Sequence, residues 1–314
     1  MMGLYFCYNF VSMILVTGGT GFIGSILIRQ LTEMGEGVRL LLHPSKSSPN
    51  LPKSVSVEVA VSSIDDERGV RAAMKNIRTV YHLASDERLG SRANLLKVDI
   101  EGTKTVSRAA ADAGVGRIFY LSHLGADRAS AFPLLKAKAI AESYIQHAGI
   151  NYTIIRSALA YGVNDHFTNS LAKLIKMSPG IMLLPGDGST ILQPIWVEDL
   201  VTSLVWAMDL PQTINQTIAV GGPEFFSIKE IIAIIMQQIG IKRTLVSIGP
   251  VYLNIMTGLI ETVTKKFPAS VFWMDYLAAD RICNLDTLPS VFGLNPARFT
   301  HRIGYLNTKH GKRS

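Results

Sequence analysis

Cysteine is scarce in this chain of 314 residues, which contains only Cys7 and Cys283. Two cysteines cannot build a disulfide framework or a cysteine-rich metal site, and they are typical of thiols in a reducing compartment. Long apolar runs are also missing, since no segment reaches the ~18 uninterrupted residues of a membrane span. Apolar residues still make up 48% of the chain, which allows a substantial core and excludes global disorder.

The first twelve residues contain neither lysine nor arginine, although apolar and aromatic side chains are frequent there. This lack argues against a secretory signal and against an arginine-rich transit peptide. We expect a cytoplasmic location, with a peripheral position at a membrane as the alternative. Met13 stands directly before the first predicted strand, so it is a candidate for the natural start beside Met1.

Acidic residues are outnumbered, with 24 Asp and Glu against 31 Lys and Arg, and the net charge is +7. Part of the excess gathers in a basic tail at residues 306–314. Such a tail can meet nucleic acid, acidic lipid or an acidic partner, or remain solvated. No nucleic-acid motif or interleaved aromatic residue accompanies it, so we expect no binding of nucleic acid.

A glycine-rich stretch at residues 13–24, Met-Ile-Leu-Val-Thr-Gly-Gly-Thr-Gly-Phe-Ile-Gly, is the most informative segment. It predicts a buried strand, a tight turn and a helix start, with Gly18, Gly21 and Gly24 three residues apart. Glycine permits positive φ and close approach of a pyrophosphate, and the helix start offers unpaired N–H groups to that anion. The G-x-x-G-x-x-G spacing differs from the commonest dinucleotide fingerprint, and a turn without a ligand is the alternative.

Strand and helix patterns alternate through the first half of the chain. Continuous β-branched runs predict an α/β fold with a Rossmann-type doubly wound parallel sheet that helices cover on both faces. Ligands of such sheets bind beyond the carboxyl ends of the strands. The predicted strands are residues 14–17, 38–42, 55–61, 78–83, 117–122 and 152–156, and the predicted helices are residues 23–34, 66–76, 100–113 and 134–148.

The regular alternation ends after Ser157, without a linker or an internal repeat. We expect a dinucleotide-binding core at residues 13–160, followed by residues 161–305, which complete the sheet and form a smaller C-terminal lobe on the substrate side. Ser227 and Glu230 fit a capping box that opens a helix closed by Gly240.

Residues 251–267 place apolar side chains at helical spacing, followed by Lys265 and Lys266. The simplest interpretation is a helix packed on the core. The alternative is an amphipathic surface helix that, together with the basic tail, contacts a protein complex or a membrane surface.

Two segments resemble the extended and atypical short-chain dehydrogenase/reductase superfamily: Thr-Gly-Gly-Thr-Gly-Phe-Ile-Gly at residues 17–24 and Val-Tyr-His-Leu-Ala-Ser at residues 80–85. Within it, four more segments resemble the NAD(P)H-binding accessory subunit of respiratory complex I (its alpha-subcomplex subunit 9) and bacterial relatives. These segments are residues 121–126, 138–142, 165–170 and 193–199.

The resemblance implies a Tyr-x-x-x-Lys pair in catalytic members, where the lysine binds the nicotinamide ribose and lowers the tyrosine pKa. The matching lysine is Lys138, but Leu134 stands four residues before it, and a shift of frame by two residues puts Phe132 there. Ser122 is near the place of the assisting serine, which our alignment gives to Leu124. We therefore expect the usual proton-transfer machinery to be missing or replaced.

Three side chains are candidates to replace the tyrosine, and each has a structural alternative. His82 lies in an apolar strand end, where a core histidine is the more frequent case. His123 lines the pocket or packs a loop. Tyr161 reaches the nicotinamide side or caps a turn.

No Asp or Glu ends the second predicted strand, so a carboxylate for the 2′-hydroxyl of NAD is missing. His43, Ser45 and Lys46 follow that strand and suit a 2′-phosphate, while alternation turns Arg39 the same way as Leu41. We favour NADP(H) over NAD(H) on this ground. The resemblance implies an Asp near the adenine, whose place Ser63 takes.

The resulting site prediction contains one candidate catalytic residue, Lys138, and no metal ligand. The predicted cofactor-binding residues are Thr17, Gly18, Gly21, Phe22, Ile23, Gly24, His43, Lys46, Leu83, Ala84, Ser85, Ser122 and Lys138.

These residues favour an NAD(P)(H)-binding protein without ordinary dehydrogenase catalysis, in which the nucleotide is structural or reports the redox state. The alternative is an NAD(P)H-dependent oxidoreductase, in which a group other than the tyrosine donates the proton. A sugar-nucleotide epimerase or dehydratase fits less well, because no pair of arginines for a diphosphate is evident in the lobe. A regulator of the NmrA-like kind, which passes the redox state to a partner, is a further option.

Overall fold

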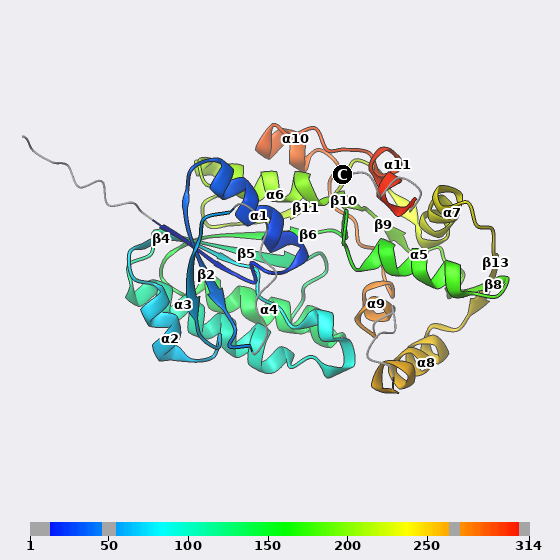
Figure 1. Ribbon diagram of the computed structural model, residues 1–314, viewed down its shortest axis with the longest axis horizontal. Coiled ribbons are helices and arrows are strands. Elements are labelled where there is room, and N and C mark those ends of the chain that lie inside the picture. The colour runs from blue at the N-terminus through cyan, green and yellow to red at the C-terminus, as the bar shows by residue number, and fades with distance from the viewer. Residues whose placement is uncertain (1–12, 46–54, 264–270, 308–314) are drawn as a thin grey trace, which may run out of the picture.

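A seven-stranded parallel sheet forms the centre of the computed structural model, which describes residues 13–45, 55–263 and 271–307. Its strand order is β11-β6-β5-β4-β1-β2-β3 (Figure 1). The chain reverses its direction of winding beside β1, where a parallel sheet opens a crevice for ligands. The strands are β1 (Met13–Thr17), β2 (Gly37–Leu42), β3 (Glu58–Val61), β4 (Ile77–His82), β5 (Arg117–His123), β6 (Asn151–Ser157) and β11 (Gln216–Val220).

Helices cover both faces of this sheet, as the sequence predicts. On one face, α1, α6 and α10 enclose a core with Ile14, Val16 and Leu40; on the other, α2, α3 and α4 enclose a second core with Leu15, Val80 and Ile118. Neighbouring strand residues thus point to opposite faces, and both faces are apolar. The helices are α1 (Phe22–Glu33), α2 (Glu67–Ala73), α3 (Gly102–Asp112), α4 (Pro133–Gln146), α6 (Val197–Trp206) and α10 (Thr287–Phe292).

The remaining elements form a lobe at the carboxyl end of the sheet, on the right of Figure 1. Its core packs α5 and α7 against residues 299–306. The capping box at Ser227 and Glu230 opens α7, and Gly240 closes it with φ of +71°, as predicted. The elements are β7 (Ala160–Tyr161), α5 (Phe167–Met177), β8 (Ile181–Pro185), β9 (Ile191–Leu192), β10 (Ile195–Trp196), β12 (Phe226–Ser227), α7 (Ile228–Ile239), β13 (Thr244–Ile248), α8 (Pro250–Val263), α9 (Val271–Tyr276), α11 (Phe299–Arg302) and η4 (Ile303–Leu306).

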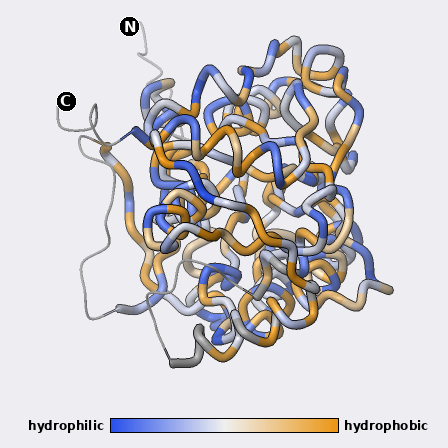
Figure 2. The backbone as a smooth tube through the Cα atoms, turned by 90° about the vertical axis from the view of Figure 1, so that its right-hand side faces the viewer, coloured by the Kyte–Doolittle hydropathy of each residue, from blue (hydrophilic) through white to orange (hydrophobic). Residues whose placement is uncertain are grey.

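The structure departs from the predicted elements in three places. The third strand covers only residues 58–61, and the strand from residues 161–305 that completes the sheet, which was not located from the sequence, is β11 beside β6. The predicted helix 100–113 is α3 preceded by a π-helical turn, η2 (Leu96–Glu101). Two short 3₁₀ segments, η1 (Glu87–Arg92) and η3 (Pro211–Thr213), complete the connections. Along most of the chain hydrophobic and hydrophilic stretches alternate every few residues (Figure 2), as expected for elements with one buried side.

Candidate functional site

Of the three evenly spaced glycines between β1 and α1, the fold requires two, Gly18 and Gly24, and does not require Gly21. Gly18 has φ of +72°, and a Cβ on it would lie 2.6 Å from the backbone carbonyl carbon of Leu83. A Cβ on Gly24 would clash with the carbonyl oxygen of Gly18. Gly21 has φ of −75°, and its Cβ would meet only that same oxygen, at 3.2 Å. The positive φ is therefore at Gly18, and the space beside Gly21 is open.

The first turn of α1 leaves its N–H groups available. Gly21 is the N-cap and its helix start has no side-chain cap and no acidic residue. A helix start without these groups presents free donors and the positive end of its dipole. The turn therefore has the shape and the polarity to hold a diphosphate.

A chain of hydrogen bonds leads from the glycine turn to α3. Thr17 Oγ1 accepts from the N–H of Ala84 at 3.3 Å and contacts His82 Nδ1 at 2.7 Å. His82 Nε2 lies 2.8 Å from Thr103 Oγ1, which donates to the carbonyl oxygen of Asp99 at 2.6 Å. The donors and acceptors along the chain fit only a proton on Nε2. Burial, reinforced by Lys138, lowers the pKa of His82 to about 3, so His82 is a neutral core histidine.

Lys138 is buried in α4, where its side chain is only 4% exposed. Its Nζ lies 3.1 Å from Oδ1 of Asp99, whose side chain is fully buried in η2. This is an ion pair without hydrogen-bond alignment, since Asp99 Oδ1 accepts no hydrogen bond from the described residues. Burial alone would lower the pKa of Lys138, but Tyr120 and Asp99 outweigh it and hold that pKa above its usual range. The ammonium is therefore permanently charged and already has a counter-ion.

A tyrosine packs against this lysine: Tyr120 on β5, with Lys138 Nζ 5.6 Å from the centre of its ring. Its hydroxyl is buried and makes no hydrogen bond within the described residues. Burial raises the pKa of Tyr120, and the opposing effect of Lys138 does not compensate for it. The hydroxyl consequently stays protonated, and it lacks the contact with the amine that a Tyr-Lys pair requires.

The position four residues before Lys138 contains hydrocarbon. Leu134 is 5% exposed and lies in the first turn of α4, after Pro133. Leu124, which follows β5, is equally buried. Ser122 is also buried, and its hydroxyl has no hydrogen-bond partner among the described residues. No side chain that can exchange a proton therefore occupies either predicted catalytic position.

The two remaining candidates lie in different environments. His123, at the end of β5, is half-buried, and its Nε2 lies 2.7 Å from Glu87 Oε2. Burial would raise the pKa of Glu87, but His123 outweighs it and lowers that pKa to about 2. Tyr161 is fully buried in the lobe, edge-on to Trp196 and Phe299. His123 therefore lies at the carboxyl edge of the sheet, whereas Tyr161 belongs to the core of the lobe.

The end of β2 presents no carboxylate at residues 43–45, and His43 is exposed there. Arg39 is occupied elsewhere, because it donates to Glu58 Oε2 at 2.8 Å and to the carbonyl oxygens of Ala73 and Lys75. The predicted contact of Lys46 lies outside the described residues. Ser63 donates to Asp65, a bond that lowers the pKa of Asp65.

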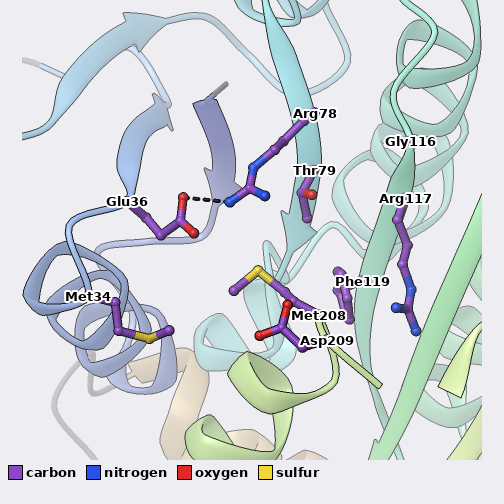
Figure 3. Close-up of a pocket in the computed structure, with 9 residues that line it drawn as sticks. All are labelled: Met34, Glu36, Arg78, Thr79, Gly116, Arg117, Phe119, Met208 and Asp209. Atoms are coloured by element: carbon purple, nitrogen blue, oxygen red, sulfur yellow. Dashed lines mark hydrogen bonds and ion pairs between the residues drawn. The ribbon is translucent and has the colours of Figure 1, made fainter. Parts of the chain in front are cut away.

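A pocket of about 220 Å³ lies at the other edge of the sheet, between the amino ends of β4 and β5 and the ends of α1 and α6 (Figure 3). Arg78 and Glu36 form an ion pair of 2.5 Å at its rim. Parallel sheets bind ligands beyond their carboxyl ends, so this pocket is not part of the predicted site.

Sequence reasoning missed three side chains that the fold brings to the carboxyl edge: Asp99, Tyr120 and Arg281. Asp99 stands between Val98 and Ile100, and an acidic residue between two apolar residues was a weak but usable signal. Arg281 follows α9 and packs against Gly125 after β5. Nothing in the sequence connects positions so far apart.

Comparisons with known proteins agree with this geometry. The model of the NmrA-like family matches residues 11–288. The chain belongs to the NmrA-like family. It has the NAD(P)-binding Rossmann-type fold of short-chain dehydrogenase/reductase proteins, which confirms the fold class and the resemblance expected from the sequence.

The relatives of this chain include a respiratory-complex subunit and a reductase. Over 230 residues, or 71% of this chain, it is 30% identical to NADH dehydrogenase [ubiquinone] 1 alpha subcomplex subunit 9, mitochondrial, from Arabidopsis thaliana, and the match spans 57% of that relative. It is 27% identical to phenylcoumaran benzylic ether reductase PT1 from Pinus taeda, over 73% of this chain and 75% of the relative.

A solved structure of similar fold is the NADPH-dependent quinone oxidoreductase QOR2 from Escherichia coli, complexed with NADPH. The superposition has a TM-score of 0.75 and covers 94% of this chain and 99% of the other, at 17% sequence identity. At that identity the likeness concerns the fold alone.

Proposed function

We propose that this chain binds NADP(H) at the glycine turn and serves as a structural or redox-reporting nucleotide binder, without the proton transfer of a Tyr-Lys pair. The observation that carries the proposal is the buried ion pair of Lys138 with Asp99 beside a leucine at position 134. A lysine lowers the pKa of a neighbouring tyrosine only if such a tyrosine is within reach of its charge.

The residues of the turn fit a dinucleotide. Gly18 and Gly24 allow the backbone to close tightly, and the open space beside Gly21 faces free N–H groups at the start of α1. Leu83, Ala84 and Ser85 follow β4, beside β1, where the nucleotide is expected to continue toward the nicotinamide. When bound, the nicotinamide supplies or accepts hydride, and this chain's residues position it.

A preference for NADP(H) is supported by what stands after β2. Residues 43–45 carry no carboxylate that would grip a ribose 2′-hydroxyl or repel a phosphate, and His43 is exposed there. Since Arg39 is held by Glu58, the proposal assigns the phosphate to His43 and Lys46.

An NAD(P)H-dependent oxidoreductase is the second candidate. The reductase among the relatives supports it, as does the half-buried His123, which pairs with Glu87 at the carboxyl edge and is able to donate a proton when charged. We propose that any activity of this kind uses His123 rather than a tyrosine.

We extend the proposal to the surroundings of the protein: α8 and the basic tail contact a protein complex or a membrane surface from a cytoplasmic position. On α8, Val251, Tyr252 and Ile255 are 69%, 72% and 58% exposed. The complex I subunit among the relatives supports a protein complex. Within the described residues, no helix has the length and apolar character to cross a membrane.

The decisive experiment combines mass spectrometry of the nucleotide that co-purifies with titration calorimetry of NADPH and NADH. We expect NADP(H) to be found, NADPH to bind more tightly than NADH, and no turnover across panels of carbonyls and quinones. If neither nucleotide binds, the proposed function is wrong. Steady consumption of NADPH with a defined acceptor that His123→Asn abolishes would establish the second candidate.

A further inference from the structure

A buried arginine of the lobe lacks the partners that such a residue normally has. Arg281 is 7% exposed, and its backbone N–H donates to the carbonyl oxygen of Ile191 at 2.8 Å, which fixes the chain beside β9. Of its guanidinium nitrogens only Nε has a hydrogen-bond partner among the described residues, the carbonyl oxygen of Tyr276 at 3.1 Å. Nη2 is fully buried without any.

Arg117, a second buried arginine of this fold, has hydrogen-bond acceptors for its whole guanidinium group. It is 8% exposed, and all three guanidinium nitrogens donate, to the hydroxyls of Thr153 and Thr213 and to the carbonyl oxygen of Ala207. A guanidinium cannot lose its proton in a protein, so a buried one whose nitrogens lack acceptors is strongly disfavoured. Arg117 has no carboxylate partner among the described residues, but neutral oxygens accept from all three of its nitrogens. Arg281 has neither a carboxylate of the described residues within 4.0 Å nor acceptors for its two terminal nitrogens, and an anion would supply those acceptors.

The guanidinium lies at the carboxyl edge of the sheet. Its Nη1 packs against Gly125, where a Cβ would clash with it, and Gly125 has φ of +83°. Gly125 is the second residue after β5, directly after Leu124, the position that our alignment gives to the assisting serine. Arg281 thus faces the loop next to the proposed nicotinamide end of the nucleotide.

A second buried donor without a partner adjoins the first. The guanidinium carbon of Arg281 lies 5.3 Å from the centre of the Tyr276 ring, and the Tyr276 hydroxyl is buried with no hydrogen-bond partner among the described residues. Burial raises the pKa of Tyr276, so its hydroxyl keeps the proton that it can donate. The His123 ring meets the Tyr276 ring edge-on at 6.0 Å.

We propose that Arg281 and the Tyr276 hydroxyl form a subsite for a small anion, a carboxylate or phosphate group on a molecule other than the dinucleotide. A planar guanidinium with its two terminal nitrogens unoccupied matches the paired oxygens of such a group. The placement of this ligand beside the nicotinamide rests on the proposed function; the anion site itself does not. The subsite therefore predicts a second ligand, a small molecule that carries a carboxylate or phosphate group.

The test titrates sodium benzoate and inorganic phosphate into the full chain by calorimetry, at constant ionic strength, with and without saturating NADPH. We expect at least one of the two anions to bind the wild-type chain. Arg281→Met should weaken that binding at least tenfold, Arg281→Lys and Tyr276→Phe several-fold. The matched control is Arg298→Met, because the Arg298 side chain is 66% exposed and pairs only loosely with Glu224.

The outcomes separate this proposal from the nucleotide site. Failure of both anions to bind the wild-type chain, or binding that survives Arg281→Met, overturns the subsite. A tenfold loss of NADPH affinity in Arg281→Met without any anion binding assigns the arginine to the cofactor and also overturns it. If NADPH does not bind at all, the proposed function fails while the titration of the free chain still decides the subsite. The Arg281→Lys variant keeps the test valid should Arg281→Met not fold.

Discussion

Replacement of Asp99 by asparagine removes the counter-ion of Lys138 while keeping the shape of the side chain. The variant leaves an ammonium that is 4% exposed, and no other carboxylate of the described residues is in ion-pair contact with it. Breaking a buried pair by removing one partner lowers stability by about 3–5 kcal/mol. That is a large part of the roughly 5–15 kcal/mol that holds a domain folded.

The loss of stability in Asp99→Asn should also depend on pH, and the environment of Lys138 determines whether it increases or decreases as the pH rises. In the wild-type chain the pKa of Lys138 is raised, so its contribution to stability is complete below the unfolded value of ~10.4 and disappears only above it. In Asp99→Asn, Tyr120 remains, but its raised pKa keeps its hydroxyl uncharged, so we expect burial to lower the pKa of Lys138 below the unfolded value. The unfolded chain then binds more protons, and the stability of the variant increases with pH. The difference in the free energy of unfolding between wild type and variant should therefore become smaller from about pH 7 to about pH 9.5.

Urea denaturation at a series of pH values measures both effects. The matched control is Asp112→Asn, because Asp112 pairs with Arg71 at 2.6 Å while both side chains are 50% exposed, and such a pair contributes less than about 1 kcal/mol. A loss below about 1 kcal/mol in Asp99→Asn, or a loss that stays constant with pH, would show that Lys138 does not depend on Asp99.

Three further variants test other parts of the site and the fold. Gly21→Val should weaken NADPH binding at least ~100-fold in calorimetry, which corresponds to about 3 kcal/mol. The melting temperature should change little, because only the Gly18 carbonyl oxygen lies near the added Cβ. Unchanged affinity for NADPH would contradict the role of the turn. Leu134→Tyr should keep nucleotide affinity and raise any weak reductase activity, and lost binding would mean that the pocket is misplaced. Ser227→Ala should lower the free energy of unfolding by about 1 kcal/mol, because Ser227 caps α7; no change would contradict the cap.

Local chemistry made much of this fold predictable. Three local patterns predicted the turn after β1, the parallel strands and α7: glycines at fixed spacing, buried β-branched runs and a capping box. Each of these patterns acts within a few residues. The prediction that Leu134 takes the place of the catalytic tyrosine depends on the same kind of local pattern, because Leu134 and Lys138 lie one helical turn apart.

Long-range burial was not predictable from such patterns. The π-helical turn η2 adds a residue to the helical repeat before α3, so a regular helical pattern does not place Asp99 on the face toward Lys138. Arg281 meets Gly125 only because the chain returns from the lobe to the carboxyl edge. The pairing of β11 with β6 likewise joins residues that are 63 positions apart, since Gln216 pairs with Thr153 and Val220 pairs with Ser157.

The hydrogen bonds from Thr17 through His82 and Thr103 to the carbonyl oxygen of Asp99 also limit which substitutions this chain tolerates. Each hydroxyl in that series both gives and receives, so a substitution at one end leaves an unsatisfied atom in the middle. Thr17, beside the glycine turn, and Thr103, in α3, are consequently coupled through the His82 ring. Evolution can replace one of these two hydroxyls only by compensating at His82 or at the other hydroxyl, whereas the side chain at position 99 can change without breaking the series, because its contribution is a backbone carbonyl.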